Sequence, residues 1–233
     1  DTVIDIKGLT ARGAWRLEDE GEGIGFLTLD LPGEKVNKLT SAVLEDLDRI
    51  LEALTHDPWL KALIIWGGKP DSGTFIAGAD IHEIRAVVDP DDAAGKARRG
   101  QRILGRFATL PAITVAAIHG NCLGGGTELA LACDFRIASV FPKTKIGLPE
   151  VQLGILPAWG GTTRLPRLVG LQAALPILLT GEPLNATKAR RIGLVDEVLP
   201  APGYKERVAQ WTRAVADGGG PRRRKRPLLT RLI

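Results

Sequence analysis

Two glutamates, Glu128 and Glu150, stand in sequence settings that support acid/base chemistry. Glu128 lies in the first turn of a helical stretch that opens with three glycines, and Glu150 lies among apolar residues at 148–154. Burial raises the pKa of a carboxyl group toward the range in which it both gives and takes protons near neutral pH. The setting of Glu150 therefore predicts proton transfer, and that of Glu128 predicts a carboxylate that is offered, with the N–H groups of the same turn, to one bound molecule. The competing interpretations are helix capping for Glu128 and a surface-loop position for Glu150.

The three glycines at 124–126 separate an apolar stretch from the helical one. Without a Cβ, glycine lets backbone N–H groups approach a ligand closely, and the first N–H groups of a helix have no partner inside it. Such donors suit an oxyanion hole, although a close strand–helix packing turn would use glycines too. The run is neither Gly-x-Gly-x-x-Gly nor followed by Gly-Lys-Ser/Thr, so it matches neither a dinucleotide fingerprint nor a phosphate-binding loop.

A loop of small residues, Ala77-Gly78-Ala79-Asp80, offers a second donor. It follows a buried strand and leads into a helix that Asp80 caps, so the N–H of Ala79 is a candidate for the second hydrogen bond of an oxyanion hole. As an isolated motif the loop indicates only a passage from loop to helix. Trp159, in another loop, either lines an apolar pocket or belongs to the core.

Strands that alternate with helices must position these residues, which indicates an α/β protein with largely parallel pairing. The turn signal Glu20-Gly21-Glu22-Gly23 joins the first two strands and predicts a hairpin. Strands are expected at 14–19, 23–31, 60–66, 113–118, 134–139 and 194–199. Helices are expected from Thr40-Ser41 to residue 54 and at 91–110, 124–132, 171–179, 186–191 and 204–216.

The composition is that of an ordinary globular protein, with 44% hydrophobic and 25% charged residues. No apolar run approaches the roughly 18–20 residues of a membrane helix, and the first nine residues lack the features of a secretory signal. We therefore expect a cytoplasmic protein that does not enter a membrane, with an organelle matrix as the alternative location. Cys122 and Cys133 have apolar neighbours and no metal-ligand spacing, which predicts reduced, buried thiols and no metal site.

The net charge of +4 depends largely on one basic run, Arg222-Arg223-Arg224-Lys225-Arg226. The rest of the chain shows no basic cluster, so nucleic-acid binding is not favoured. A solvated segment is the simpler interpretation of the run. The alternative is a contact surface for RNA.

Taken together, the motifs resemble the crotonase (enoyl-CoA hydratase/isomerase) superfamily. Ala-Gly-Ala-Asp-Ile at 77–81, His-Gly-x-x-Leu-Gly-Gly-Gly-x-Glu at 119–128, Pro-Glu-Val-x-Leu-Gly-Ile at 149–155 and Gly-Gly-Thr-x-Arg-Leu-Pro-Arg at 160–167 occur in the order of that family. The resemblance covers about residues 14–199. It is greatest to the hydratase half of multifunctional fatty-acid oxidation proteins.

The resemblance implies a spiral of ββα units that hydrates 2-trans-enoyl-CoA in fatty-acid β-oxidation, with enoyl-CoA isomerase activity in addition. It assigns catalysis to Glu128 and Glu150 and an oxyanion hole to the N–H groups of Ala79 and Gly125. It also implies that the coenzyme A thioester is the substrate, that no metal or redox cofactor is needed, and that the chain forms a homo-oligomer or part of a multifunctional complex. The substrate-binding residues that it implies are Ala77, Gly78, Asp80, Ile81, Gly124 and Trp159.

The chain also departs from the family pattern. Ala158-Trp159 replaces small residues, which is expected to reshape the acyl pocket, and Pro176 is expected to interrupt a helix that the family leaves unbroken. We divide the chain into a crotonase domain at 1–199 and a tail at 200–233, a truncated helical segment or linker. The shortness of this tail leaves open an inactive, truncated domain of a longer protein, or a different assembly.

Overall fold

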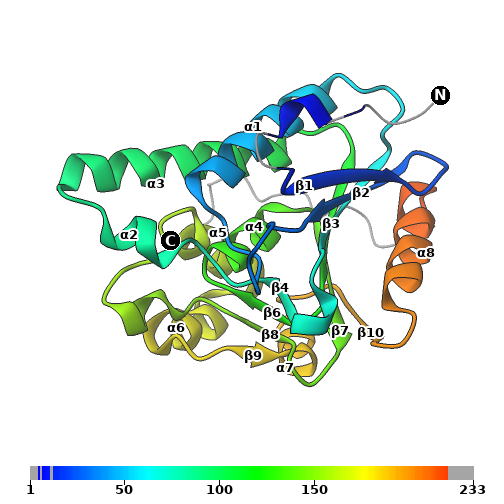
Figure 1. Ribbon diagram of the computed structural model, residues 1–233. Helices are drawn as coiled ribbons and strands as arrows, with labels where there is room; N and C mark the ends of the chain where they lie inside the picture. Colours follow the sequence, from blue (N-terminus) through cyan, green and yellow to red (C-terminus); the bar gives the residue numbers. More distant parts are fainter. Residues whose placement is uncertain (1–4, 6, 11–12, 220–233) are drawn as a thin grey trace.

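Two β-sheets and the helices around them form the structure, a computed structural model that describes residues 5, 7–10 and 13–219 (Figure 1). The larger sheet has the order β1-β2-β3-β5-β7-β10 and the smaller one the order β4-β6-β8-β9. In the larger sheet β1 is antiparallel to β2 and the other pairs are parallel. Its strands are Trp15–Asp19, Ile24–Leu29, Ala62–Gly67, Ile113–Ile118, Phe135–Val140 and Glu197–Pro200, in the order β1, β2, β3, β5, β7, β10.

The chain repeats one pattern, a strand of the large sheet followed by a strand of the small sheet and then by helical structure. The small-sheet strands are β4 (Thr74–Ile76), β6 (Asn121–Leu123), β8 (Lys145–Gly147) and β9 (Leu184–Asn185). The helices that follow β4 are α2 (Ile81–Arg85) and α3 (Pro90–Gly105), β6 leads into α4 (Gly125–Ala132), and β8 leads into the 3-10 helix η4 (Pro149–Leu153) and α5 (Gly161–Val169). This repetition is the expected spiral of ββα units and confirms the predicted fold class.

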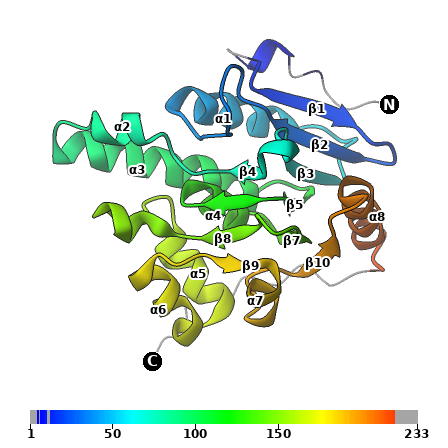
Figure 2. The same ribbon diagram turned by 60° about the horizontal axis from the view of Figure 1, so that its bottom comes forward.

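Both faces of the large sheet are covered, and every position of its strand β3 is buried. Leu63 and Ile65 of β3 pack into the main core with α1 (Ser41–Thr55), whereas Ile64 and Trp66 pack into a second core with α8 (Tyr204–Ala216). Figure 2 shows α1 and α8 on opposite sides of β2 and β3. The alternation of neighbouring side chains between the two cores follows from the period of two in a β-strand.

Most of the expected elements are present. The hairpin pairs Trp15 with Leu29, and Thr40 caps α1 by accepting a hydrogen bond from the N–H of Val43. The helix expected at 91–110 ends at Gly105 and continues as the 3-10 helix η3 (Arg106–Ala108), and the last strand begins only at Glu197. Both cysteines are buried and free, as predicted.

The expectation that Pro176 interrupts a helix was wrong. Pro176 lies inside α6, which runs over Leu171–Thr180 without a break. Proline lacks only its own N–H, so one hydrogen bond near the middle is lost. The last turn of α6 is completed beyond Pro176, where Gly181 donates to the carbonyl of Ile177 and the hydroxyl of Thr180 donates to the carbonyl of Pro176.

The C-terminal part of the described chain is ordered against the sheet. After α7 (Ala186–Arg191) and β10, Tyr204 of α8 is buried and its hydroxyl donates to the carbonyl of Ile137 in β7, at 2.7 Å. The basic run at 222–226, on which the RNA-binding alternative depends, lies outside the described residues. Among the described helices, none combines the length and apolarity needed to cross a bilayer.

Candidate active site

The first turn of α4 is held tightly between the strands of the small sheet. The hydroxyl of Thr127 lies 2.6 Å from the carbonyl oxygen of Cys122 in β6 and 2.8 Å from that of Gly147 in β8. Gly126 packs directly on β4, since a Cβ at this position would lie 2.9 Å from the Cβ of Ile76. The helix N-terminus is therefore fixed relative to all three parallel strands of this sheet.

The two expected oxyanion-hole donors lie side by side. A Cβ built on Gly125 would lie 3.3 Å from the backbone nitrogen of Ala79. Gly125 is the first residue of α4, so its N–H has no partner within the helix. Leu39 pairs with the neighbours of Ala79, donating to Gly78 and accepting from Asp80, and this pattern leaves the N–H of Ala79 outside the pairing. Both donors are thus available to one oxygen atom.

Glu128 is almost completely buried, with 2% of its surface exposed. Its Oε1 accepts hydrogen bonds from the backbone N–H groups of Trp159 (2.7 Å) and Gly161 (2.8 Å). Burial raises the pKa of Glu128 to about 7 and the nearby charge of Glu150 adds to this, while the two N–H donors oppose it. The side chain is therefore fixed through one oxygen and is able to change protonation state near neutral pH.

Glu150, the first acidic residue of η4, is also buried. A Cβ on Gly124 would lie 3.0 Å from Oε1 of Glu150, so the carboxyl group packs against the glycine run. Its Oε2 is buried and has no hydrogen-bond partner in the described protein. Burial raises the pKa of Glu150 as well. An unpaired buried carboxyl oxygen is costly, which is typical of a group that meets its partner in a bound substrate.

Of the predicted substrate-binding residues, two glycines lie together beside the candidate donors and the others lie around them. Gly78 and Gly124 face each other, with the Cα of Gly78 3.8 Å from the position of a Cβ on Gly124. Asp80 has a structural role, because its side chain caps α2 by accepting a hydrogen bond from the N–H of His82 and forms an ion pair with Lys38 at 3.0 Å. Ile81 is exposed at the start of α2, and Ala77 donates its N–H to Asn37. The substrate contacts themselves stay a prediction for all six residues.

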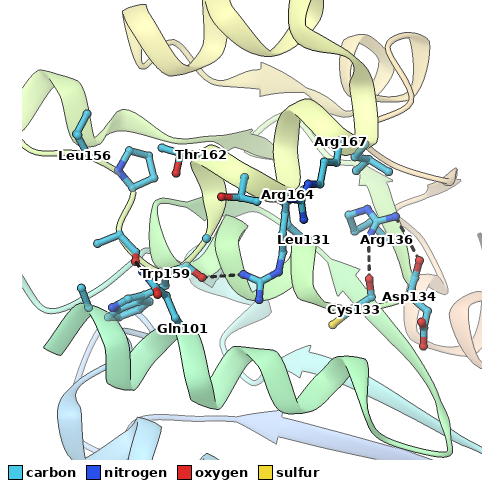
Figure 3. A pocket seen from close by; sticks show the side chains of 16 residues that line it. Gln101, Leu131, Cys133, Asp134, Arg136, Leu156, Trp159, Thr162, Arg164 and Arg167 are labelled. Carbon is cyan, nitrogen blue, oxygen red and sulfur yellow. Dashed lines mark hydrogen bonds between the residues drawn. The ribbon is translucent and has the colours of Figure 1, made fainter. Parts of the chain in front are cut away.

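Trp159 completes the site from the loop before α5. Its ring lies against the oxyanion loop, 2.5 Å from where a Cβ of Gly125 would be. The carbonyl of Trp159 accepts a hydrogen bond from Arg164 at 2.7 Å, and that of Ala158 accepts one from Gln101 of α3, also at 2.7 Å (Figure 3). Trp159 therefore borders Gly125 and Glu128 and is not simply a residue of the core.

The backbone donors to Glu128 were not identified from the sequence. A partial signal exists in the Gly160-Gly161 pair, because a Cβ on Gly161 would lie 3.1 Å from Oε1 of Glu128. The sequence does not reveal which carboxylate such a glycine faces. Among the described residues, no group of three His, Cys, Asp or Glu side chains is arranged to hold a metal ion.

Comparison with known proteins was made for sequence and structure. The family model for enoyl-CoA hydratase/isomerase matches residues 19–221. The fatty acid oxidation complex subunit alpha of Aliivibrio fischeri is 49% identical over 192 residues, which are 82% of this chain and 27% of that protein. The chain thus spans about a quarter of the length of this relative.

Solved structures of enoyl-CoA hydratases are similar to this chain as well. An enoyl-CoA hydratase structure from Geobacillus kaustophilus superposes with a TM-score of 0.81 at 33% identity, covering 87% of this chain and 74% of that one. An enoyl-CoA hydratase from Bacillus anthracis has a TM-score of 0.80 at 33% identity, covering 87% and 76%.

Proposed function

Because the chain belongs to the enoyl-CoA hydratase/isomerase family, we propose that it adds water to 2-trans-enoyl-CoA to give 3-hydroxyacyl-CoA in fatty-acid β-oxidation. The membership confirms the resemblance that the motifs indicated. The observation that carries the proposal is the pairing of two buried carboxyl groups with two adjacent backbone donors. Hydration of an unsaturated thioester needs both parts.

In this proposal the thioester oxygen accepts hydrogen bonds from the N–H groups of Ala79 and Gly125. Addition of water to C3 moves negative charge onto that oxygen, giving an enolate-like transition state. Donors that are already in place stabilise this charge without reorganisation, and loss of one such donor typically costs about 3–4 kcal/mol. The closeness of Ala79 to Gly125 supports this role.

The two glutamates divide the proton transfers. Glu128, which two N–H groups hold through Oε1, is ionised and takes a proton from the attacking water. Glu150 is assigned the proton delivery to C2: burial raises its pKa, and its Oε2, which has no partner in the described protein, is free to face the substrate. A C–O bond forms at C3 and a C–H bond forms at C2, while the π bond between C2 and C3 breaks. Glu128 then loses its proton to solvent and Glu150 takes one up, which restores the pair. The scheme uses acid/base chemistry alone, so we propose no cofactor besides the coenzyme A of the substrate.

The family also includes isomerases, and the same pair would move a proton between C4 and C2 of a 3-enoyl-CoA. We propose this as an additional activity. We further propose that the chain acts in the cytoplasm as a homo-oligomer or as part of a multifunctional complex. The name of the Aliivibrio relative, a subunit of a fatty acid oxidation complex, supports the latter.

The experiment that tests the function follows the ultraviolet absorbance of the enoyl thioester with crotonyl-CoA. Wild type should turn over, whereas Glu128→Gln and Glu150→Gln should each lower kcat/KM by about 10²–10⁴, the range for loss of a general acid or base. Glutamine keeps the shape of each side chain and removes only its ability to ionise. Glu206→Gln, on the exposed surface of α8, is the matched control and should leave kcat/KM unchanged.

No turnover by folded wild type with any enoyl-CoA would reject hydration for this chain and favour the truncated, inactive domain. Unchanged turnover in each of the two glutamine variants would reject the assignment of acid/base roles to Glu128 and Glu150. Release of a 2-enoyl-CoA from a 3-enoyl-CoA in the same assay tests the isomerase activity. Salt-sensitive RNA binding that disappears when residues 222–226 are removed would instead support the RNA-binding alternative.

A further inference from the structure

The indole of Trp159 spans the space between two helices. One edge lies at Gly125, the first residue of α4, and the other lies at Gly100 in α3, where a Cβ would be 2.6 Å from Cγ of the ring. Glycine inside a helix costs about 0.5–1 kcal/mol relative to alanine. The ring explains this cost at position 100, because any larger residue there would collide with it.

The loop that carries this ring is fixed from three sides. Glu128 accepts from the N–H of Trp159, Arg164 donates to its carbonyl, and Gln101 donates to the carbonyl of Ala158. The backbone next to the ring is therefore held by the carboxylate of Glu128 on one side and by α3 and α5 on the other. These hydrogen bonds fix the backbone from which the ring projects toward Gly125.

A cavity of about 900 Å³ lies beside the ring. Its apolar lining comes from Ala97 of α3, Leu131 of α4, Leu156 and Pro157 of the loop, and Leu168 of α5, together with Trp159 itself. Figure 3 shows Trp159 and Gln101 at one end of this cavity and Arg136 and Asp134 at the other. The lining includes neither glutamate of the pair and neither oxyanion-hole donor.

From this placement, and resting on the proposed function, we propose that Trp159 sets the acyl chain length that the enzyme accepts. The indole lies between Gly125 and the apolar side of this cavity, whose lining also includes Arg136, Arg164 and Arg167. An acyl tail that extends beyond C3 meets the ring within the reach of Gly125 and Glu128, so a short tail fits and a long one does not. A smaller residue at position 159 joins the cleft to the cavity, and the cavity then receives the tail.

The test measures kcat/KM for 2-enoyl-CoA substrates of 4, 8, 12 and 16 carbons, each below its critical micelle concentration. Wild type should prefer the four-carbon substrate over the twelve-carbon one at least tenfold. Trp159→Ala should raise the ratio of twelve-carbon to four-carbon kcat/KM at least tenfold, and Trp159→Leu should raise it less. A ratio within one variant does not depend on the fraction of folded enzyme.

Two further variants are controls. Ala97→Phe in the Trp159→Ala background refills the cavity and should abolish the gain for long chains. Trp211→Ala removes a tryptophan that packs against Phe135, with ring centroids 5.4 Å apart, and should leave the ratio unchanged. Equal turnover of all chain lengths by wild type, or an unchanged ratio in Trp159→Ala, would overturn the inference and leave the hydratase proposal intact.

Binding separates the inference from the proposed function. Saturated butanoyl-CoA and dodecanoyl-CoA are not hydrated, and calorimetry gives their affinities whether or not the protein is a hydratase. Trp159→Ala should raise the affinity for dodecanoyl-CoA relative to butanoyl-CoA at least tenfold. Absence of this change would overturn the inference even if no substrate were turned over.

Discussion

At the scale of single residues, burial makes Glu128 sensitive to pH. Its pKa is about 7 in the folded protein against an ordinary value of 4.5, chiefly because of burial. The protonated form is therefore favoured by folding. The contribution of Glu128 to the free energy of unfolding is greatest below pH 4.5 and is lost as the pH rises through about 7.

Glu128→Gln should consequently be more stable than wild type at pH 8 by roughly 3 kcal/mol, the equivalent of the shift in pKa from 4.5 to about 7. At pH 5 the two proteins should differ by less than about 1 kcal/mol, because the wild-type side chain is then protonated as well. Urea unfolding at both pH values measures this difference. A gap that is the same at pH 5 and pH 8 would mean that Glu128 ionises normally in the folded protein.

At the scale of elements, the fit between α4 and the small sheet determines whether the donors are aligned. The hydroxyl of Thr127 contacts the carbonyl oxygens of Cys122 and Gly147 and thereby ties the helix to β6 and β8. Thr127→Val keeps the shape and removes the hydroxyl. It should lower the free energy of unfolding by about 1–3 kcal/mol, the cost of leaving a buried polar group unpaired.

Thr127→Ser keeps the hydroxyl and is the matched control, with an expected loss below about 1 kcal/mol, since it removes only one methyl group. Chemical denaturation compares both variants with wild type. The valine variant should also lower kcat for crotonyl-CoA, because Gly125 and Glu128 lie within the same two turns. Equal stability of the valine and serine variants would show that the hydroxyl does not anchor α4.

At the scale of the whole molecule, a buried ion pair connects the segment before β10 to the end of α4. Arg136 of β7 pairs with Asp196 at 2.7 Å, and their side chains are 4% and 10% exposed. The same guanidinium group donates to the carbonyls of Cys133, at the end of α4, and Leu194. The segment before β10 is thus held against the helix whose other end carries the oxyanion donor.

Removal of one partner leaves a buried charge without compensation, so Asp196→Asn should cost about 3–5 kcal/mol of stability. Arg136→Met should cost a similar amount, and the double variant should cost less than the sum of the two. Thermal and urea unfolding of the four proteins give the coupling energy directly. Strict additivity would show that the pair contributes no more than its separate contacts.

Local patterns in the sequence were sufficient for much of this structure. The apolar runs, the cap at Thr40 and the Gly-rich entry to α4 each depend on neighbouring residues, so the strands of the large sheet, most of the helices and the family resemblance were predicted. The four short strands of the small sheet were not predicted. The burial of both faces of β3 also follows from its continuous apolar run. Pro176 was misjudged, because the cost of one missing hydrogen bond within α6 depends on the packing around that helix.

By itself, the sequence determined which residues are chemically able to act: two carboxyl groups, glycines that admit backbone donors, and a tryptophan at an unusual place. Only the tertiary structure decided how they meet. It buried Glu128 under the N–H groups of Trp159 and Gly161, 31 and 33 residues further along the chain. It also wedged the indole between Gly100 and Gly125. The reason is physical, since pKa shifts, hydrogen bonds and steric limits depend on distances across space, which residue type and spacing along the chain do not specify.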